Sequence, residues 1–343
     1  MKKLKIFLIF IVLAFIIGLG IFNYDRIISY LGFPTRGLEY TLNEEGTSYS
    51  VKKGKMRNVE KLIIPSTYKE LPVTIIENSA FMNCSSIIEV EIPDSITAIG
   101  DEAFLGCKNL KEIIIPNTVL DIGKGSFFGC TNLKYYSSPF SGSGVEGKNY
   151  IGFVFGASLS FDNASFVPKS LEIIKITSDS KPIDPYGFAF LSNLKEISII
   201  ETQKNINVNI LHKCDNIERI SLPLVIPGVS YLFGGNIPDS LKYFNLNNLD
   251  NKILFGSFFK DCKGLISVNI PESIEYIEPE AFKGCISLKY IYIPKSVFYL
   301  GDNAFDDCPN IEINCQVLSK PIAWSNSWNP DNQTVVWGAI SKK

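Results

Sequence analysis

The chain has 343 residues, of which 46% are hydrophobic and 20% charged, and its 33 basic and 35 acidic side chains leave a formal net charge of −2. A single compact core rarely grows past about 250–300 residues, so this length favours two domains or an elongated repeat fold. No basic excess is available to neutralise phosphates, which argues against nucleic-acid binding. The single histidine, His212, leaves little material for zinc coordination or acid–base catalysis, and we expect no catalytic site, metal site or cofactor.

The N-terminus has the composition of an export signal. Residues 1–5 carry three lysines and are predicted to form a cytoplasmic tail, and residues 6–24 are predicted to form a membrane segment with an uncharged run from Ile6 to Phe22. A helix spans a bilayer with about 17–25 apolar residues, so this run reaches the lower limit. The basic tail places everything after Asp25 outside the cell.

Two outcomes remain open for this segment. Ile21 continues the apolar run beyond Gly18-Leu19-Gly20, and no alanine marks a cleavage site, which favours an uncleaved signal-anchor in the cell membrane with a single pass. Alternatively, residues 6–17 are the apolar region of a signal peptide, and cleavage near Gly20 releases a secreted chain.

Residues 59–316 are predicted to be repeats. Four segments, 87–109, 110–132, 265–287 and 288–310, align without gaps on the template L-x-x-I-x-I-P-x-S-[VI]-x-x-I-G-x-x-A-F-x-x-C-x-x. The leading apolar position recurs at Val59, Ile87, Leu110, Leu133, Leu171, Leu194, Ile217, Leu241, Leu265, Leu288 and Ile311. The L-x-x-I-x-I part alternates with period 2 and predicts a short strand that the following proline ends. One such unit cannot bury its own apolar face, so the units must stack.

These motifs resemble the BspA-like leucine-rich repeat family of bacterial surface proteins. The resemblance implies an α/β-type repeat solenoid, a curved right-handed rod with a parallel sheet on its concave side, placed after the transmembrane signal-anchor helix. Residues 25–58 are then a juxtamembrane segment followed by the opening hairpin of the family. Residues 317–343 resemble the family's C-terminal cap, and all three tryptophans fall within 324–337, as suits an apolar lid on the last unit.

The repeat register breaks over residues 138–170 and 223–240. Both stretches share an F-G…[VI]-P-x-S-L pattern and lack the A-F-x-x-C segment. In the first stretch, Ser141-Gly142-Ser143-Gly144 is not followed by the lysine of a phosphate loop, so it is predicted to be a flexible loop tip. Asn163-Ala164-Ser165 fits the N-glycosylation sequon, which matters only in a eukaryotic secretory pathway.

Seven of the eight cysteines share one repeat position: Cys84, Cys107, Cys130, Cys214, Cys262, Cys285 and Cys308. Leu191 occupies the same position in its unit, and no C-x-x-C pair exists for a metal. Equivalent side chains on stacked units point in parallel, whereas disulfides need convergent Cβ vectors. The cysteines are therefore predicted to be buried free thiols rather than disulfides or nucleophiles.

The candidate ligand-binding residues are those that point outward from the strands. By the period of two, they are the third and fifth residues of each unit. Toward the C-terminal half they become small polar residues flanked by tyrosines, at Arg219, Ser221, Tyr243, Asn245, Asn269, Tyr290 and Tyr292. Exposed aromatic rings among small polar groups suit contact with a protein or a glycan. The alternative is that tyrosine is simply favoured on half-exposed sheets.

The sequence thus predicts a non-enzymatic, surface-displayed protein that mediates protein or glycan binding or adhesion through its concave face. A structural envelope or self-assembling scaffold protein is the alternative. Neither the ligand nor the oligomeric state follows from these residues.

Overall fold

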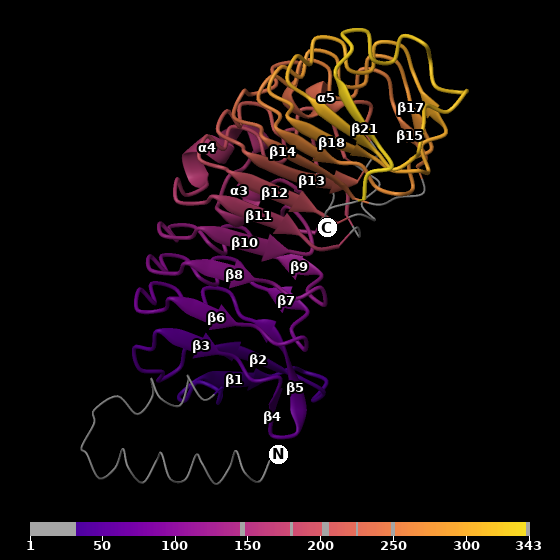
Figure 1. Ribbon diagram of the computed structural model, residues 1–343. Coiled ribbons are helices and arrows are strands. Elements are labelled where there is room, and N and C mark those ends of the chain that lie inside the picture. The colour runs from indigo at the N-terminus through magenta and orange to yellow at the C-terminus, as the bar shows by residue number, and fades with distance from the viewer. Residues whose placement is uncertain are drawn as a thin grey trace, which may run out of the picture.

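The chain folds into coils stacked along one bent rod (Figure 1). The computed structural model describes residues 32–144, 148–178, 181–200, 206–223, 226–247 and 251–340. The predicted membrane segment, 6–24, lies outside these residues, and no helix within them is long and apolar enough to cross a bilayer. The right hand of the coil and the concave position of its sheet stay predictions.

One face of the rod is a parallel sheet built from one strand per coil. Its ten strands follow the chain in the order β8 (Glu112–Ile114), β10 (Tyr135–Ser138), β11 (Ile173–Ile176), β12 (Glu196–Ile199), β13 (Arg219–Pro223), β14 (Tyr243–Asn247), β16 (Ser267–Asn269), β18 (Tyr290–Ile293), β20 (Glu312–Cys315) and β21 (Thr334–Trp337). The parallel pair β3 (Lys61–Ile63) and β6 (Glu89–Glu91) precedes them in the same row of Figure 1. We call the solvent side of this row the sheet face.

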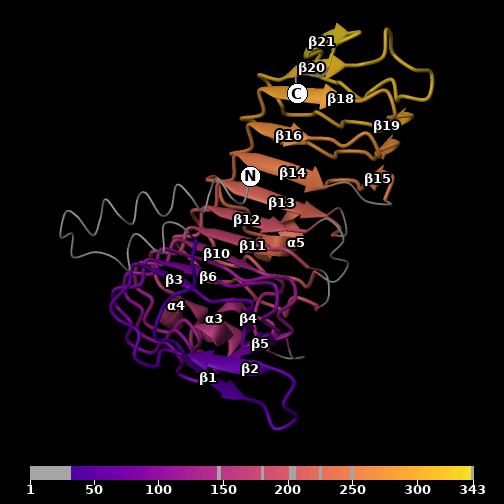
Figure 2. The same ribbon diagram turned by 90° about the horizontal axis from the view of Figure 1, so that it is seen from below.

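Shorter strands line the next corner of the coils. At the N-terminal end they are β1 (Glu39–Leu42), β2 (Tyr49–Lys52), β4 (Thr67–Tyr68), β5 (Leu71–Ile76), β7 (Ala98–Ile99) and β9 (Asp121–Ile122). At the C-terminal end they are β15 (Ile253–Leu254), β17 (Tyr276–Ile277) and β19 (Tyr299–Leu300). Figure 2 shows β15 and β19 to one side of the row that holds β14, β16 and β18. The extra residues of the first unit form the antiparallel hairpin β4–β5, which turns through Lys69 and Glu70 at positive φ.

The predicted repeat register is confirmed by burial. All eleven leading positions, from Val59 to Ile311, are at most 7% exposed. Within β8, Ile113 is fully buried while Ile114, its neighbour, is 54% exposed. Such alternation follows from the period of a strand, whose successive side chains point to opposite faces, and it identifies the outward residues of each coil.

Phenylalanines of the A-F-x-x-C turn stack from coil to coil inside the rod. The ring centroids of Phe81 and Phe104 are 5.3 Å apart, those of Phe104 and Phe127 are 5.6 Å apart, and the rings are nearly parallel. The turns also bond directly to each other, since the Phe104 N–H donates to the Ser126 carbonyl at 2.8 Å. Each coil thereby satisfies buried backbone groups of its neighbour, so no coil is stable alone.

All eight cysteines are buried free thiols, as predicted. The structure adds a reason for cysteine that the pattern did not reveal. The Cys107 thiol donates to the carbonyl of Phe81 in the preceding coil at 3.3 Å, and the Cys214 thiol donates to that of Phe188 at 3.1 Å. The same bond joins Cys130, Cys285 and Cys308 to Phe104, Phe259 and Phe282. The slot therefore suits a small apolar group that is also a weak donor.

The buried thiols should resist thiol reagents in the folded protein. Burial raises the pKa of Cys107 and Cys214 to about 12, and only the thiolate is a nucleophile. We expect no reaction with a disulfide reagent at pH 8 and release of eight equivalents after denaturation, followed by absorbance. Rapid labelling of two or more thiols without denaturant would contradict the burial of the eight cysteines. Because these pKa values lie above the ordinary 9.0 of the unfolded chain, the stability they contribute is complete below pH 9 and declines as the pH rises toward 12.

The first break in the register contains three short helices: α3 (Ile151–Val154), η1 (Ser160–Asp162) and α4 (Asn163–Phe166). The second break contains α5 (Val229–Phe233). Both breaks replace the missing A-F-x-x-C turn. The Phe127 N–H donates to the carbonyl of Val154 in α3, and the Leu211 N–H donates to that of Leu232 in α5. The helices therefore continue the stack instead of projecting from it.

The prediction of a flexible tip at residues 141–144 is wrong. Ser141 and Ser143 are 1% and 2% exposed. The Ser141 hydroxyl donates to the Asn149 carbonyl at 2.6 Å, and the Ile122 N–H donates to the Ser143 carbonyl at 3.0 Å. This segment extends the row of corner strands beyond β9, and its small residues permit close backbone approach rather than mobility.

Both ends of the rod are covered. At the N-terminal end, β1 and β2 form an antiparallel hairpin, and β2 joins the corner sheet through β5. At the C-terminal end, Trp324 and Trp328 are 2% and 5% exposed, and Trp328 lies 5.9 Å from Phe305 at the end of the phenylalanine stack. The tryptophans thus shield the last coil from water.

Candidate functional site

A shallow groove of about 320 Å³ crosses the four neighbouring strands β12, β13, β14 and β16 on the sheet face. Five of the seven candidate binding residues line it: Arg219, Ser221, Tyr243, Asn245 and Asn269. They come together because parallel pairing sets Arg219 opposite Tyr243, Ser221 opposite Asn245, and Asn245 opposite Asn269. Residues at the same repeat position, about 23 apart in sequence, become neighbours about 4.8 Å apart.

The floor of the groove is the rod's own core. Ile197, Ile220 and Phe244 line it from below and are at most 2% exposed. They alternate with the outward residues along β12, β13 and β14, so each strand contributes both floor and wall. A groove supported by packed strands keeps its side chains at fixed spacing.

A chain of side-chain hydrogen bonds runs across the groove. The Asn269 amide donates to Asn245 Oδ1 at 3.0 Å, and the Asn245 amide donates to the Ser221 hydroxyl at 3.2 Å. These bonds fix the orientation of the amides. Asn269 Oδ1 has no hydrogen-bond partner within the described part of the chain, so it can accept one from a ligand.

Arg219 and Tyr243 form the charged end of the groove. The Arg219 guanidinium lies over the Tyr243 ring, with its carbon 4.9 Å from the ring centroid, and Tyr243 is 39% exposed. Among the described residues Arg219 makes no ion pair, although Glu196 lies opposite it on β12. The ring therefore holds the guanidinium by cation–π attraction while its N–H donors face solvent.

Tyr290 and Tyr292 lie on β18, beyond the lining of the groove. Both are half-buried, with Tyr290 opposite Glu312 and Tyr292 opposite Asn314 on β20. Burial, reinforced by the Glu312 carboxylate, raises the pKa of Tyr290. These two tyrosines flank the groove, and Tyr290 is joined to it through Ser267, its neighbour on β16.

Sequence reasoning missed Ser267, which lines the groove. It is the third residue of the unit that begins at Leu265, so the period-2 rule points to it. Glu196, which also lines the groove, is the third residue of the unit that begins at Leu194. The rule selected outward positions, but the groove's extent across four strands depends on side-chain volumes that no single unit reveals.

The groove offers hydrogen-bond donors and acceptors around one aromatic ring. Asn, Ser and Arg side chains of this kind can form hydrogen bonds with a polar ligand. In the described segments no group of three or more His, Cys, Asp or Glu side chains is placed to hold a metal ion.

One family profile matches most of this chain. The profile of the BspA type leucine-rich repeat region matches six copies over residues 54–147, 159–258 and 228–312. A leucine-rich repeat protein from Bacteroides ovatus is 20% identical, covers 89% of this chain and 99% of its own, and superposes with a TM-score of 0.34. A leucine-rich cell surface protein from Faecalibacterium prausnitzii is 19% identical over 90% and 98%, with a TM-score of 0.28. The T. pallidum leucine-rich repeat protein is 15% identical over 90% and 99%, with a TM-score of 0.21. A search of curated proteins found no match.

Proposed function

The chain belongs to the family of proteins with BspA type leucine-rich repeats, and from that premise we propose that it is a non-enzymatic, surface-displayed binding protein. Its binding site is the sheet-face groove around Arg219, Tyr243 and Asn269, with Tyr290 and Tyr292 at its edge. The observation that carries the proposal is the convergence of outward residues from four strands on one exposed groove. Its ligand is a protein or a glycan, because the groove joins an aromatic ring to open polar groups.

Display at the surface rests on the N-terminal segment. Three lysines followed by the uncharged run Ile6–Phe22 favour a signal-anchor. We expect the protein to fractionate with membranes, and protease added outside intact cells should digest the repeats, as an immunoblot of cell fractions would show. A soluble species that begins near Ile21 would instead demonstrate cleavage and secretion.

Loss of the stacked Arg219–Tyr243 pair should abolish most of the binding. Full-length protein displayed on beads is incubated with envelope extracts, host extracts and a glycan array. For any partner retained by the wild type, the double variant Arg219→Ala/Tyr243→Ser should bind at least about tenfold more weakly, equivalent to about 1.4 kcal/mol. Aromatic and arginine side chains dominate most interface energies, which is why this pair is chosen.

Tyr276→Ser provides a matched control. Tyr276 is 38% exposed, compared with 39% for Tyr243, but it lies on the corner strand β17. Equal loss of capture in both variants would show a general effect of surface tyrosines and sink the groove proposal. Self-association without any other partner would favour the alternative function, a structural or self-assembling scaffold.

A further inference from the structure

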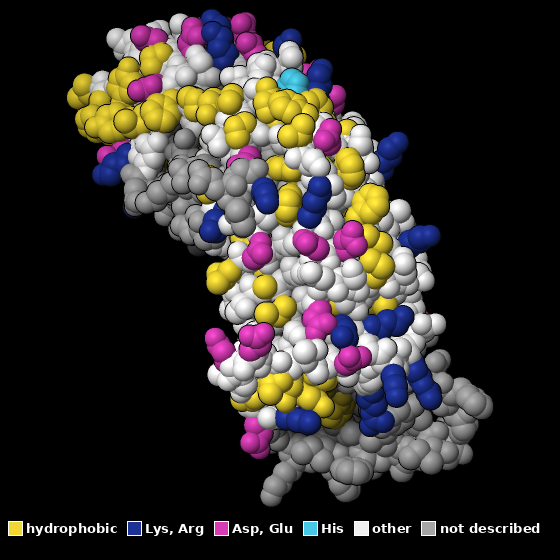
Figure 3. Space-filling model, turned by 180° about the vertical axis from the view of Figure 1, so that it is seen from behind, with side chains coloured by type: hydrophobic (Ala, Val, Ile, Leu, Met, Phe, Trp, Pro, Cys, Tyr) yellow, Lys and Arg dark blue, Asp and Glu magenta, His cyan; other side chains and the backbone are white. Residues whose placement is uncertain are grey.

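The turn side of the rod, which carries the A-F-x-x-C turns, changes character along its length. The position compared is the one that follows the buried phenylalanine of each A-F-x-x-C turn. In the first coils this residue is apolar (Met82, Leu105 and Phe128), and in the last coils it is charged (Lys260, Lys283 and Asp306). The charged residues pair with each other or with Glu280, as in Lys283–Asp306 at 2.7 Å and Lys260–Glu280 at 2.8 Å. The apolar residues have no such partners. Figure 3 shows hydrophobic side chains spaced along the right-hand margin of the back of the molecule, below the single histidine.

The first insertion adds aromatic rings to this apolar half. Phe166 of α4 lies 6.1 Å from Phe128 of the preceding coil. On the other flank, Phe161 lies 4.7 Å from Tyr186 and 6.3 Å from Phe190 of the following coil. Phe161 and Phe128 are 58% and 44% exposed. The insertion therefore joins the coils on both sides into one exposed aromatic ridge.

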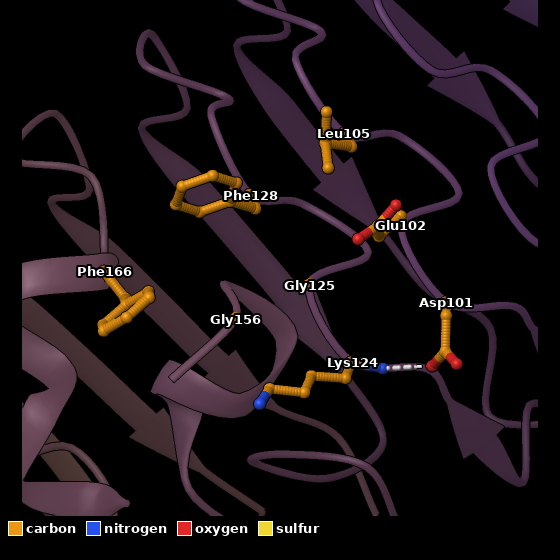
Figure 4. Close-up of a pocket in the computed structure, with 8 residues that line it drawn as sticks. All are labelled: Asp101, Glu102, Leu105, Lys124, Gly125, Phe128, Gly156 and Phe166. Carbon is orange, nitrogen blue, oxygen red and sulfur yellow. Dashed lines mark hydrogen bonds between the residues drawn. The ribbon is translucent and has the colours of Figure 1, made fainter. Parts of the chain in front are cut away.

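A hollow of about 360 Å³ lies in this ridge (Figure 4). Phe128, Phe166 and Leu105 form its apolar walls, and Gly125 and Gly156 form its floor. A Cβ at Gly156 would lie 3.5 Å from the Phe166 ring and 3.6 Å from the Phe128 ring. The glycine thus keeps the space between the two rings empty.

The polar side chains that line the hollow differ in whether they already have hydrogen-bond partners. Asp101 Oδ1 accepts the Lys124 N–H at 2.6 Å, and the Lys124 ammonium donates to the Ser158 hydroxyl at 2.9 Å. The Glu102 carboxylate takes part in no hydrogen bond or ion pair within the described residues. In Figure 4 it projects toward the space between Phe128 and Gly125. The open polar group of the hollow is therefore an anionic acceptor.

From these contacts we infer that the hollow binds an arginine side chain of a basic, apolar polypeptide segment that lies along the aromatic ridge. The guanidinium stacks on the Phe128 or Phe166 ring and donates to the Glu102 carboxylate, while its methylene stem contacts Leu105. Apolar residues of the same segment contact Phe161 and Tyr186. This site lies away from the sheet-face groove, and the inference does not rest on the function proposed there.

A sugar fits the hollow less well than an arginine. Sugar recognition needs several open donors and acceptors around one ring, whereas here Asp101 and Lys124 are already bonded. Aromatic faces carry negative charge density, and with Glu102 they attract a cation. A planar guanidinium satisfies both the rings and the carboxylate at once.

The test compares small probes on full-length protein in a polyoxyethylene detergent by saturation-transfer NMR. The probes are N-acetylarginine amide, its neutral isostere N-acetylcitrulline amide, and N-acetylglucosamine. We expect the arginine probe to bind at least about fivefold more tightly than the citrulline probe, as charge-assisted and cation–π contacts allow. Glu102→Gln and Phe128→Ser should each remove most of that difference.

Two matched variants exclude nonspecific effects. Glu89→Gln removes an exposed carboxylate on the sheet face, and Phe298→Ser removes a ring that is 61% exposed near β19; both should leave the preference for arginine unchanged. Equal binding of the arginine and citrulline probes, or the same arginine affinity in Glu102→Gln, overturns the inference. Preferential binding of N-acetylglucosamine would reassign the hollow to a glycan. Thermal unfolding of each variant verifies that it is folded.

Discussion

Replacing Asn163 with leucine is expected to lower the free energy of unfolding by about 4 kcal/mol, because buried backbone groups of two coils then lose their hydrogen-bond partner. Asn163 is fully buried. Its Oδ1 accepts the Gly152 N–H at 2.9 Å, and its amide donates to the carbonyls of Tyr186 and Ala189, both at 3.2 Å. Leucine leaves the Gly152 N–H and the Ala189 carbonyl without this partner, and each orphaned group costs about 1–3 kcal/mol.

Urea unfolding followed by circular dichroism would measure this loss. Ser165→Ala is the control, since it removes the same glycosylation sequon at an exposed position and leaves Asn163 intact. A leucine variant as stable as the control would mean that the insertion is not bound to the next coil through Asn163. Gly152 belongs to the same contact, because a Cβ there would lie 2.3 Å from Asn163 Oδ1. The buried asparagine also cannot accept a glycan in the folded protein.

The adjacent residues Phe127 and Phe128 should differ widely in their contribution to stability. Phe127 is fully buried, stacks on Phe104 and lies 6.1 Å from Tyr136. Phe127→Ala removes a ring from a close-packed interior and should cost about 3–5 kcal/mol. Phe128 is 44% exposed, so Phe128→Ala should cost less than about 1 kcal/mol.

Thermal and urea unfolding of the two alanine variants would measure the contrast. The pair is well matched, because both variants remove the same side chain from adjacent positions of one turn. Similar losses in both variants would contradict a continuous phenylalanine stack. A loss in Phe127→Ala confined to the coils near residue 127, detected by hydrogen exchange, would agree with the nearest-neighbour coupling of repeat proteins.

Much of the architecture was determined by the sequence alone. Ile113, Leu133 and Phe104 stand at three different positions of the 23-residue repeat, and each has equivalents in other units. All three are buried, as the period requires. Burial at one position must be repeated at the next, because stacked coils cover each other's apolar faces. The same periodicity selected the outward residues of the groove, since side chains of a strand alternate strictly between two faces.

Tertiary structure alone decided the contacts between units that depart from the repeat. Nothing in the sequence around Asn163 indicates that it bonds to residues 186–189, because its partners are backbone groups and any residue type supplies them. For the same reason Ser141 and Gly142 resemble a mobile loop in sequence, although they pack beside β9. The hollow between Phe128 and Phe166 depends on how the insertion lies against the preceding coil. A periodic pattern specifies whether each side chain of a strand points into the core or out to solvent. Where the period is broken, the position of the segment is decided by how it packs against the neighbouring coils.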